Sequence, residues 1–233
     1  MPFFLKSLTV FALIYLITYL MAFLGLILPT QVLPMLLLGV AAYLFGSIPF
    51  GLVFTKLFEG KDLRQMGSGN IGATNVMRTG RKSLALATLI CDAGKVALMI
   101  ALTKHFHHTQ TSVLWVASLG ILGHLFPLWL SFKGGKGVAS AAGAVLVLSW
   151  PVGVAAIMCW LLVFLITRLS SLSAIAALAL APLVSYALAE PTPLTLWLLG
   201  LCALILVKHK ENIMRLIQGQ EGKIDFTSSK KDG

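Results

Sequence analysis

Long apolar runs, separated by short polar segments, dominate this chain. A membrane-spanning helix needs about 20 consecutive, mainly apolar residues, and eight runs are candidates for such helices. They cover residues 8–28, 31–55, 83–102, 111–130, 138–149, 151–167, 172–188 and 193–207. The run at 138–149 is short and rich in small residues. The pattern predicts an all-α fold, a polytopic helix bundle embedded in a membrane.

Composition agrees with a membrane protein and excludes an ordinary soluble domain. Hydrophobic residues make up 58% of the 233 residues and charged residues only 11%, whereas soluble domains carry roughly 25% charged residues. The three cysteines, Cys91, Cys159 and Cys202, lie inside apolar runs without metal-ligand spacing, so we interpret them as packing residues. The sequence contains no Walker A or G-x-S-x-G motif. We expect neither a metal ion nor a cofactor.

The basic residues indicate how the helices are oriented. With eight crossings, segments 56–82, 131–137, 167–171 and 208–233 share one side and hold 15 of the 18 Lys and Arg residues. Because positive residues favour the cytoplasmic side, we expect these segments and both termini to be cytoplasmic. The same placement explains most of the formal charge of +10. Since no basic helix or aromatic RNA-binding motif is present, we expect no nucleic-acid partner.

Four polar segments on this side have an unusual composition. They are GSGNIGATNVMRTG at 67–80, FKGGKGVAS at 132–140, RLSSLS at 168–173 and KHKENIMRL at 208–216. Glycine lets successive backbone N–H groups point into one concavity that binds anions, and a helix N-terminus adds its dipole. The sequence therefore predicts a phosphate site at this face, and two Gly-rich loops suggest more than one phosphate. A simple turn is the alternative interpretation of each loop taken alone.

Several titratable residues have simpler interpretations than catalysis. Asp92 and Lys95 lie three residues apart in one span, which favours a buried ion pair over a contribution to a site. His124 is better explained as a packed or hydrogen-bonding residue at a helix end. The HFHH segment at 105–108 falls on the opposite side of the membrane, with no cysteine or carboxylate partner nearby. We interpret it as a solvated loop.

The polar motifs resemble the PlsY family, the acyl-phosphate-dependent glycerol-3-phosphate acyltransferases of the bacterial inner membrane. The resemblance is carried by GSIPFGL (46–52), GSGNIGATNVMR (67–78), GHLFPLWLSFKGGKGVAS (123–140), SSLSA (170–174) and HKENIMRL (209–216). It implies a catalytic membrane domain of seven helices over residues 33–216. Residues 1–32 would then form an extra N-terminal transmembrane helix. Residues 217–233 would form a basic, flexible C-terminal tail.

The resemblance also implies a reaction and a set of ligands. An acyl chain passes from acyl phosphate to the 1-hydroxyl of sn-glycerol 3-phosphate, which gives 1-acyl-sn-glycerol 3-phosphate (lysophosphatidic acid) and phosphate in phospholipid biosynthesis. The implied glycerol-3-phosphate ligands are Ser68, Arg78, Lys136, His209 and Asn212, of which Ser68, Arg78 and Lys136 are the expected catalytic residues. The implied acyl-phosphate ligands are Asn70, Gly72, Thr74, Gly134, Gly135, Ser171 and Ser173.

The same resemblance implies the surroundings of the protein. It places a multi-pass protein in the inner (plasma) membrane, with the lipid bilayer around it and its active site on the cytoplasmic face. The enzyme that makes acyl phosphate is a candidate protein partner. The H-x4-D signature of the common glycerolipid acyltransferases is missing from the sequence. The donor phosphate itself is a candidate acceptor for the hydroxyl proton.

A membrane transporter of an organic phosphate is the alternative function. Transporters also place glycine breaks and helix ends around anions, but they do so near the middle of the bilayer. In this sequence the charged groups collect on one face instead. A non-catalytic scaffold would leave the loops rich in Gly, Asn and Lys without a purpose.

Overall fold

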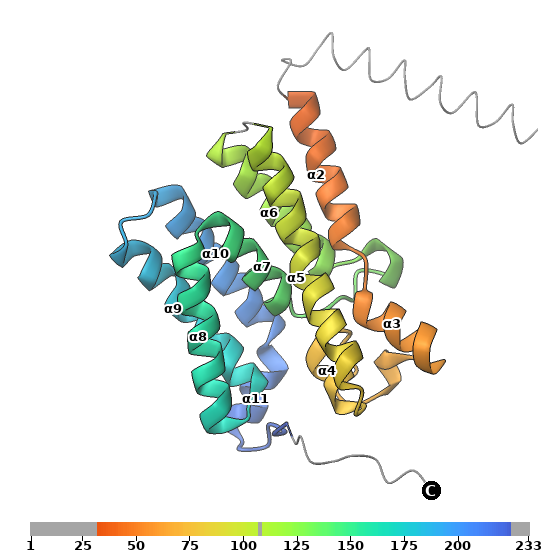
Figure 1. Ribbon diagram of the computed structural model, residues 1–233. Coiled ribbons are helices and arrows are strands. Elements are labelled where there is room, and N and C mark those ends of the chain that lie inside the picture. Colours follow the sequence, from red (N-terminus) through yellow and green to blue (C-terminus); the bar gives the residue numbers. More distant parts are fainter. Residues whose placement is uncertain (1–31, 107–108, 225–233) are drawn as a thin grey trace, which may run out of the picture. The chain divides into compact units, whose positions relative to one another are not determined.

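The computed structural model describes residues 32–106 and 109–224, and every regular element within these ranges is helical (Figure 1). The helices are α2 (Val32–Gly46), α3 (Phe50–Glu59), α4 (Ala73–Arg78), α5 (Lys82–His105), α6 (Gln110–Leu125), α7 (Val138–Leu148), α8 (Trp150–Thr167), α9 (Ser170–Ala187), α10 (Thr192–Lys208) and α11 (Lys210–Ile217), with short 3-10 helices at Leu63–Gln65 and Leu128–Leu130. The all-α membrane bundle is confirmed. The predicted helix at 8–28, two histidines of the HFHH segment and the end of the tail lie outside the described residues.

Five helical segments of the described chain are long and apolar enough to cross a membrane. They are Val32–Glu59, Lys82–His105, Gln110–Leu130, Trp150–Thr167 and Ser170–Ala187. The pair α10 and α11, bent by 68° at His209, is a further candidate. The protein is therefore an integral membrane protein with several apolar spans. By its contacts the chain divides after Val40, and the unit from Ala41 onward contains all four polar segments.

Helix α7 is shorter than the crossing that its apolar pattern predicts. Its 11 residues extend over about 16 Å at 1.5 Å per residue, against a hydrocarbon core of roughly 30 Å. It packs against α5 and α8. At its C-terminus, Lys104 Nζ donates to the carbonyl oxygens of Val147 (2.5 Å) and Leu148 (3.3 Å). These bonds satisfy carbonyls that have no partner within the helix, so the short helix is fixed at its far end.

Buried apolar side chains of several helices form the core of this unit. Val96 and Ile100 of α5, Ile121 of α6, and Leu198 and Ile205 of α10 are at most 2% exposed and belong to one cluster. Alanine and valine side chains of α7 and leucine and alanine side chains of α9 belong to the same cluster. The helices that carry the polar loops are therefore packed together.

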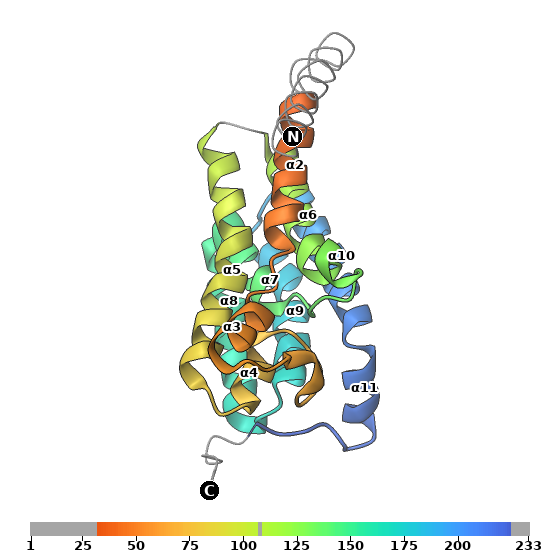
Figure 2. The same ribbon diagram turned by 90° about the vertical axis from the view of Figure 1, so that its right-hand side faces the viewer.

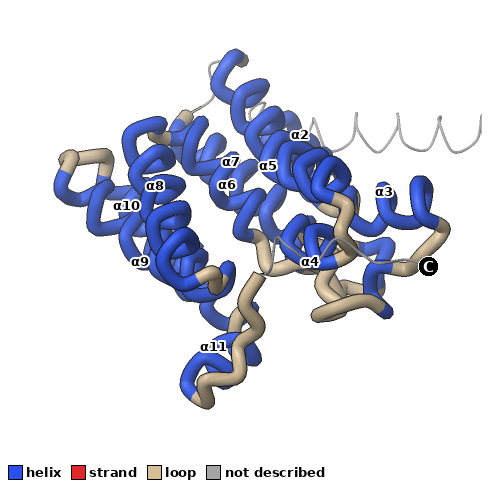
Figure 3. Tube along the Cα trace, turned by 60° about the horizontal axis from the view of Figure 1, so that its bottom comes forward, coloured by secondary structure: helices blue, strands red, loops and turns tan. Residues whose placement is uncertain are grey.

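The polar segments gather toward one end of this unit. In two perpendicular views, α4 and α11 lie toward the same end of α5 and α8 (Figures 1 and 2). Figure 3 brings that end forward and shows long loops around α4 and beside α11. The loop charges predict this convergence, and the structure provides it.

Helices α2 and α6 approach each other closely at glycine residues. A Cβ atom at Gly123 of α6 would lie 2.2 Å from the carbonyl oxygen of Tyr43, and one at Gly46 would lie 2.1 Å from that of Gly120. Small residues let helix backbones approach closely in membranes. Gly46 and Gly123 are therefore required for steric reasons, because any side chain would collide with the backbone of the other helix.

We expect Gly123→Ala to lower the free energy of unfolding by about 1–3 kcal/mol, because the added methyl group would force the two backbones apart. Thermal unfolding of the purified protein in detergent measures this change. Gly94→Ala in α5 is the matched control, since a Cβ there would meet nothing within 4 Å. Equal losses in the two variants would contradict the steric explanation.

Candidate active site

Asn75 organises the loop that precedes α4. Its Oδ1 atom accepts from the Ser68 N–H (3.0 Å), and its Nδ2 donates to the Asn70 carbonyl (2.8 Å). Gly67 and Gly69 adopt the left-handed conformation, with φ of +53° and +70°, which glycine reaches without a steric cost. A Cβ at Gly67 would also lie 2.3 Å from Asn75 Oδ1. The loop is thus wound around one amide that is only 2% exposed.

One further hydrogen bond shapes the end of this loop, and another attaches it to α9. The Asn70 Oδ1 atom accepts from the Gly72 N–H (3.1 Å) at the start of α4. The hydroxyls of Thr74 and Ser170 lie 3.1 Å apart and form a hydrogen bond. The first turns of α4 and α9, which are distant in sequence, are therefore joined at their side chains.

The loop before α7 fits tightly under the end of α6. The Gly135 N–H donates to the His124 carbonyl (3.1 Å). A Cβ at Gly134 would lie 2.2 Å from that carbonyl oxygen, and one at Gly135 would lie 2.2 Å from His124 Nε2. Neither residue has a positive φ, unlike Gly137 (+84°). The first two glycines of KGGKG are therefore explained by close approach to His124.

Lys136 extends from this loop toward α11. Its Nζ donates to Asn212 Oδ1 at 2.5 Å. Burial lowers the pKa of the Lys136 ammonium below its usual value, while the nearby Glu221 carboxylate opposes that shift. Removal from water also strengthens the attraction between this ammonium and a bound anion.

Glu221 joins two of the polar segments. Its Oε1 accepts from the Ser171 hydroxyl (2.6 Å) and from Asn212 Nδ2 (2.6 Å), and its Oε2 accepts from Arg215 Nε (2.8 Å). Burial acts to raise the pKa of the Glu221 carboxyl, but these three hydrogen bonds outweigh it and hold the pKa below its usual value. Ionised Glu221 therefore fixes the start of α9 to α11.

Residues 218–224 belong to this arrangement, although the sequence analysis assigns them to a flexible tail. The Ile224 N–H donates to the Arg168 carbonyl (3.0 Å), and the Ile224 side chain is 5% exposed. Arg78 donates to the Gly222 carbonyl at 3.4 Å. Sequence reasoning missed Glu221 because it is one of four acidic residues that follow α10, and nothing local distinguishes it from the others.

Two cavities open among these segments and share part of their walls. One, of about 390 Å³, extends between α5, α7, α8 and α9 and is lined mainly by alanine, glycine, valine, leucine and isoleucine. The other, of about 610 Å³, is bordered by Lys208, Lys210 and Arg215. Residues common to both are Ser68, Asn70, Arg78, Lys136 and Glu221. We call them the apolar cavity and the polar cavity.

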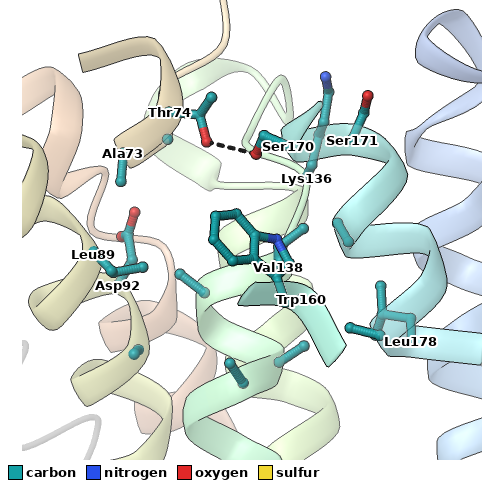
Figure 4. Close-up of a pocket in the computed structure, with 18 of the residues that line it drawn as sticks. Ala73, Thr74, Leu89, Asp92, Lys136, Val138, Trp160, Ser170, Ser171 and Leu178 are labelled. Atoms are coloured by element: carbon teal, nitrogen blue, oxygen red, sulfur yellow. Dashed lines mark hydrogen bonds between the residues drawn. The ribbon is translucent and has the colours of Figure 1, made fainter. Parts of the chain in front are cut away.

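Figure 4 shows how the apolar cavity is enclosed. Trp160 of α8 projects between Leu89 of α5 and Leu178 of α9, and Lys136 lies near the hydrogen-bonded Ser170. Polar groups therefore lie at one end of a space whose depth is apolar. Such a cavity can hold a long hydrocarbon chain with a polar head.

The structure brings most of the predicted site residues together. Those that line the apolar cavity are Ser68, Asn70, Gly72, Thr74, Arg78, Lys136, Ser171, His209 and Asn212. Gly134 and Gly135 line the polar cavity instead. Ser173 lines neither, because its hydroxyl is fully buried and donates to the Leu169 carbonyl (2.8 Å). Ser170, which the sequence analysis did not select, lines the apolar cavity in its place.

The expected ion pair between Asp92 and Lys95 is present, with Lys95 Nζ 2.8 Å from Asp92 Oδ1. The interpretation of His124 as a packed or hydrogen-bonding residue at a helix end is confirmed, because its Nδ1 lies 3.0 Å from the same Lys95 Nζ. Asp92 and His124 both line the apolar cavity. The buried pair is thus a cluster of three side chains at the cavity wall.

Comparison with known proteins decides the family. The family described as glycerol-3-phosphate acyltransferase matches residues 36–219. The chain belongs to this family. It is therefore an acyltransferase, and the resemblance seen in the sequence motifs is confirmed.

Curated members of the glycerol-3-phosphate acyltransferase family are similar over most of their length. The protein named glycerol-3-phosphate acyltransferase in Caulobacter vibrioides (strain NA1000 / CB15N) is 48% identical over 193 residues, which cover 81% of this chain and 88% of the relative. That of Rhodospirillum rubrum is 47% identical over 206 residues, which cover 84% and 94%.

Solved structures agree. The crystal structure of PlsY, an integral membrane glycerol 3-phosphate acyltransferase, in its glycerol 3-phosphate form superposes with a TM-score of 0.78 at 37% identity, covering 82% of this chain and 96% of that chain. The lysophosphatidic acid form gives 0.76 at 35% identity, with coverage of 83% and 96%. Fold and family are thus supported by sequence and structure together.

Proposed function

We propose that this protein transfers an acyl chain from acyl phosphate to the 1-hydroxyl of sn-glycerol 3-phosphate, for phospholipid synthesis. The products are 1-acyl-sn-glycerol 3-phosphate and inorganic phosphate. The observation that carries the proposal is the pair of cavities that share Ser68, Arg78 and Lys136. One suits a small dianion and the other an acyl chain, so the two substrates meet at the shared residues. The names of the relatives and the glycerol 3-phosphate form of PlsY support this acceptor.

The polar cavity is the proposed acceptor site. Arg78 can hold a phosphate through two parallel hydrogen bonds, whereas Lys136 acts as a point charge. Lys208, Lys210 and Arg215 at the rim attract the dianion from solution. Arginine and lysine at the cavity thus supply the charge that glycerol 3-phosphate requires.

His209 and Asn212 complete the proposed acceptor ligands. His209 Nδ1 lies 2.9 Å from the Ile205 carbonyl, and a carbonyl can only accept, so Nδ1 carries the proton and Nε2 is an acceptor. That acceptor can orient a glycerol hydroxyl. Asn212 is already bonded to Lys136 and Glu221, which fixes its amide.

The apolar cavity is the proposed donor site. Asn70, Gly72, Thr74 and Ser171 border its polar end and supply amide and hydroxyl groups for the head of acyl phosphate. The acyl chain would extend along α7 and α8 toward the depth of the bundle. Gly134 and Gly135 border the polar cavity, so we assign them to the phosphate on the acceptor side.

Transfer requires no nucleophile from the protein, because acyl phosphate is an activated mixed anhydride. The glycerol oxygen attacks the acyl carbon, the bond from that carbon to the phosphate oxygen breaks, and phosphate leaves with the electron pair. The departing phosphate takes the hydroxyl proton. Orientation of the two substrates can contribute about 7–11 kcal/mol, and Lys136 neutralises charge on the leaving group.

Purified protein in detergent, given palmitoyl phosphate and glycerol 3-phosphate, tests the proposal. We expect lysophosphatidic acid and phosphate in equal amounts, with little phosphate release when glycerol 3-phosphate is omitted. Absence of the acylated product in a folded preparation would refute the proposal. A transporter of an organic phosphate is not supported, because the family is one of acyltransferases and the cationic residues that line the polar cavity lie in loops and at helix ends.

For its location, we propose the bacterial inner membrane with the site on the cytoplasmic face. The loops that carry Lys133, Arg168 and Lys210, together with segment 56–82, hold 15 of the 18 Lys and Arg residues, and positive loops stay on that side. Single cysteines at these three exposed positions, in a variant without the native cysteines, should react only with a membrane-permeant reagent in intact cells. Labelling of any of them from the periplasm would contradict the orientation.

A further inference from the structure

Three charged or polar side chains form a buried cluster within spans α5 and α6. Asp92 and Lys95 are 2% exposed and His124 is 4% exposed. Lys95 Nζ lies 2.8 Å from Asp92 Oδ1, 3.0 Å from His124 Nδ1 and 2.8 Å from the Ile48 carbonyl oxygen. An ammonium group has three donors and no acceptor, so all three of its hydrogen bonds are used.

This arrangement fixes the tautomer of His124. Because Lys95 can only donate, Nδ1 must accept, and the proton of the neutral ring lies on Nε2. Asp92 Oδ1 is 3.6 Å from Nδ1, which is too far for a hydrogen bond that would compete. The cluster therefore presents an N–H group from the far side of the imidazole ring.

The Nε2 atom lies beside the loop before α7, since a Cβ at Gly135 would be 2.2 Å from it. Among the residues that the structure describes, no acceptor forms a hydrogen bond with Nε2, while His124 lines the apolar cavity directly below the loop with Gly135 and Lys136. An N–H group at the cavity wall that has no protein acceptor can donate to a ligand. A ligand oxygen in the cavity would satisfy it.

A purely structural role for the cluster of Asp92, Lys95 and His124 does not explain why the third partner of Lys95 is a histidine at the cavity wall. Asp92 and the Ile48 carbonyl already accept from two of the three N–H groups of Lys95. Any other acceptor could accept from the third. Such a role requires only the Nδ1 side of His124 and gives no reason for a polar Nε2 at the cavity wall. Ionisable groups inside a membrane are expensive and usually functional.

We propose that His124 Nε2–H donates a hydrogen bond to an oxygen at the head of the acyl donor, where negative charge grows as the glycerol hydroxyl attacks. Lys95 and Asp92 are positioning residues that hold the required tautomer. This inference rests on the proposed function and adds a residue to it. The donor is the ligand because His124 borders the apolar cavity and not the polar one.

Two amide substitutions separate this role from a structural one. Glutamine places an N–H near the position of Nε2, whereas asparagine reaches only the position of Nδ1, next to Lys95. We expect His124→Gln to keep kcat/KM for palmitoyl phosphate within about tenfold of the original. His124→Asn should lose about 10²–10³-fold, the usual effect of removing one such donor. If His124 only satisfies Lys95, the order of the two variants reverses, and equal activities also overturn the proposal.

Ser140→Ala is the matched control. The Ser140 hydroxyl is fully buried, donates to the Asp92 carbonyl (2.8 Å) and lines neither cavity. Its loss removes a buried hydrogen bond beside the cluster without changing the cluster's side chains. Thermal unfolding midpoints should fall alike for Ser140→Ala and His124→Asn, while only the second variant loses turnover.

Nitrogen NMR of the full chain, with ¹⁵N-labelled histidine in detergent, gives a readout independent of turnover. The His124 signals, assigned with His124→Gln, should show a protonated Nε2 and an unprotonated Nδ1, and Lys95→Met should remove that preference. Palmitoyl phosphate, added without glycerol 3-phosphate, should shift the Nε2 signal. The opposite tautomer or an unshifted signal would overturn the inference. A preparation that shows both effects but forms no lysophosphatidic acid would count against the proposed function alone.

Discussion

Lys136→Ala is expected to lose nearly all acyl transfer while the protein still folds and inserts. Lys136 borders both cavities, so its ammonium is close to both proposed phosphates. It is the candidate for neutralising the phosphate that departs, and removal of one such stabilising group usually lowers kcat by about 10²–10³-fold. Initial rates of phosphate release at saturating palmitoyl phosphate and glycerol 3-phosphate measure the effect.

Lys133 provides the matched control, because it is exposed, lies in the same loop and lines neither cavity. Lys133→Ala should keep its turnover, with at most a small change in KM for glycerol 3-phosphate. Near-normal turnover of a well-expressed Lys136→Ala protein would remove Lys136 from the site. An equal loss in both variants would show that only the overall loop charge matters.

Arg78→Lys should also lose much of the activity, although it keeps the positive charge. The guanidinium group can bind phosphate through two parallel hydrogen bonds, and an ammonium group cannot. Arg78 also donates to the Gly222 carbonyl (3.4 Å), which ties it to the segment that carries Glu221. We expect kcat/KM for glycerol 3-phosphate to fall by about tenfold or more, since 1.4 kcal/mol corresponds to a factor of ten.

Arg81→Lys tests whether any arginine of this region behaves alike. Arg81 is exposed, pairs with Glu59 (3.1 Å) and lines neither cavity. Lysine keeps a positive charge beside Glu59, whose side chain is 7% exposed, so activity should remain close to that of the unchanged protein. Comparable losses in the two variants would contradict the bidentate role of Arg78.

The fold and the convergence of the polar loops could be predicted from the sequence because both follow from local quantities. Apolar run length indicates a crossing, and loop charge indicates a side. The length of α7 could not be predicted in this way. Its apolar run resembles a span, but it ends where Lys104 caps the carbonyls of Val147 and Leu148, a contact made by a residue more than forty positions away.

The site was predictable where a side chain stands in a distinctive motif, and not where its role depends on contacts between segments. Asn75 is one of two asparagines in segment 67–80, and only its three-dimensional partners distinguish it. Glu221 gains its role from Ser171 and Asn212, which are distant in sequence or separated by a turn. The SSLS segment does not tell which serines face the cavity, because the rotation of α9 decides it. That rotation buries Ser173.

The proposed function requires that the protein takes its acyl chain from acyl phosphate and not from a coenzyme A thioester. The direct measurement supplies palmitoyl phosphate and palmitoyl-CoA separately, at equal concentration, to one preparation with glycerol 3-phosphate. We predict lysophosphatidic acid and stoichiometric phosphate from palmitoyl phosphate, and little or no product from palmitoyl-CoA. Robust turnover with palmitoyl-CoA and none with palmitoyl phosphate would contradict the account.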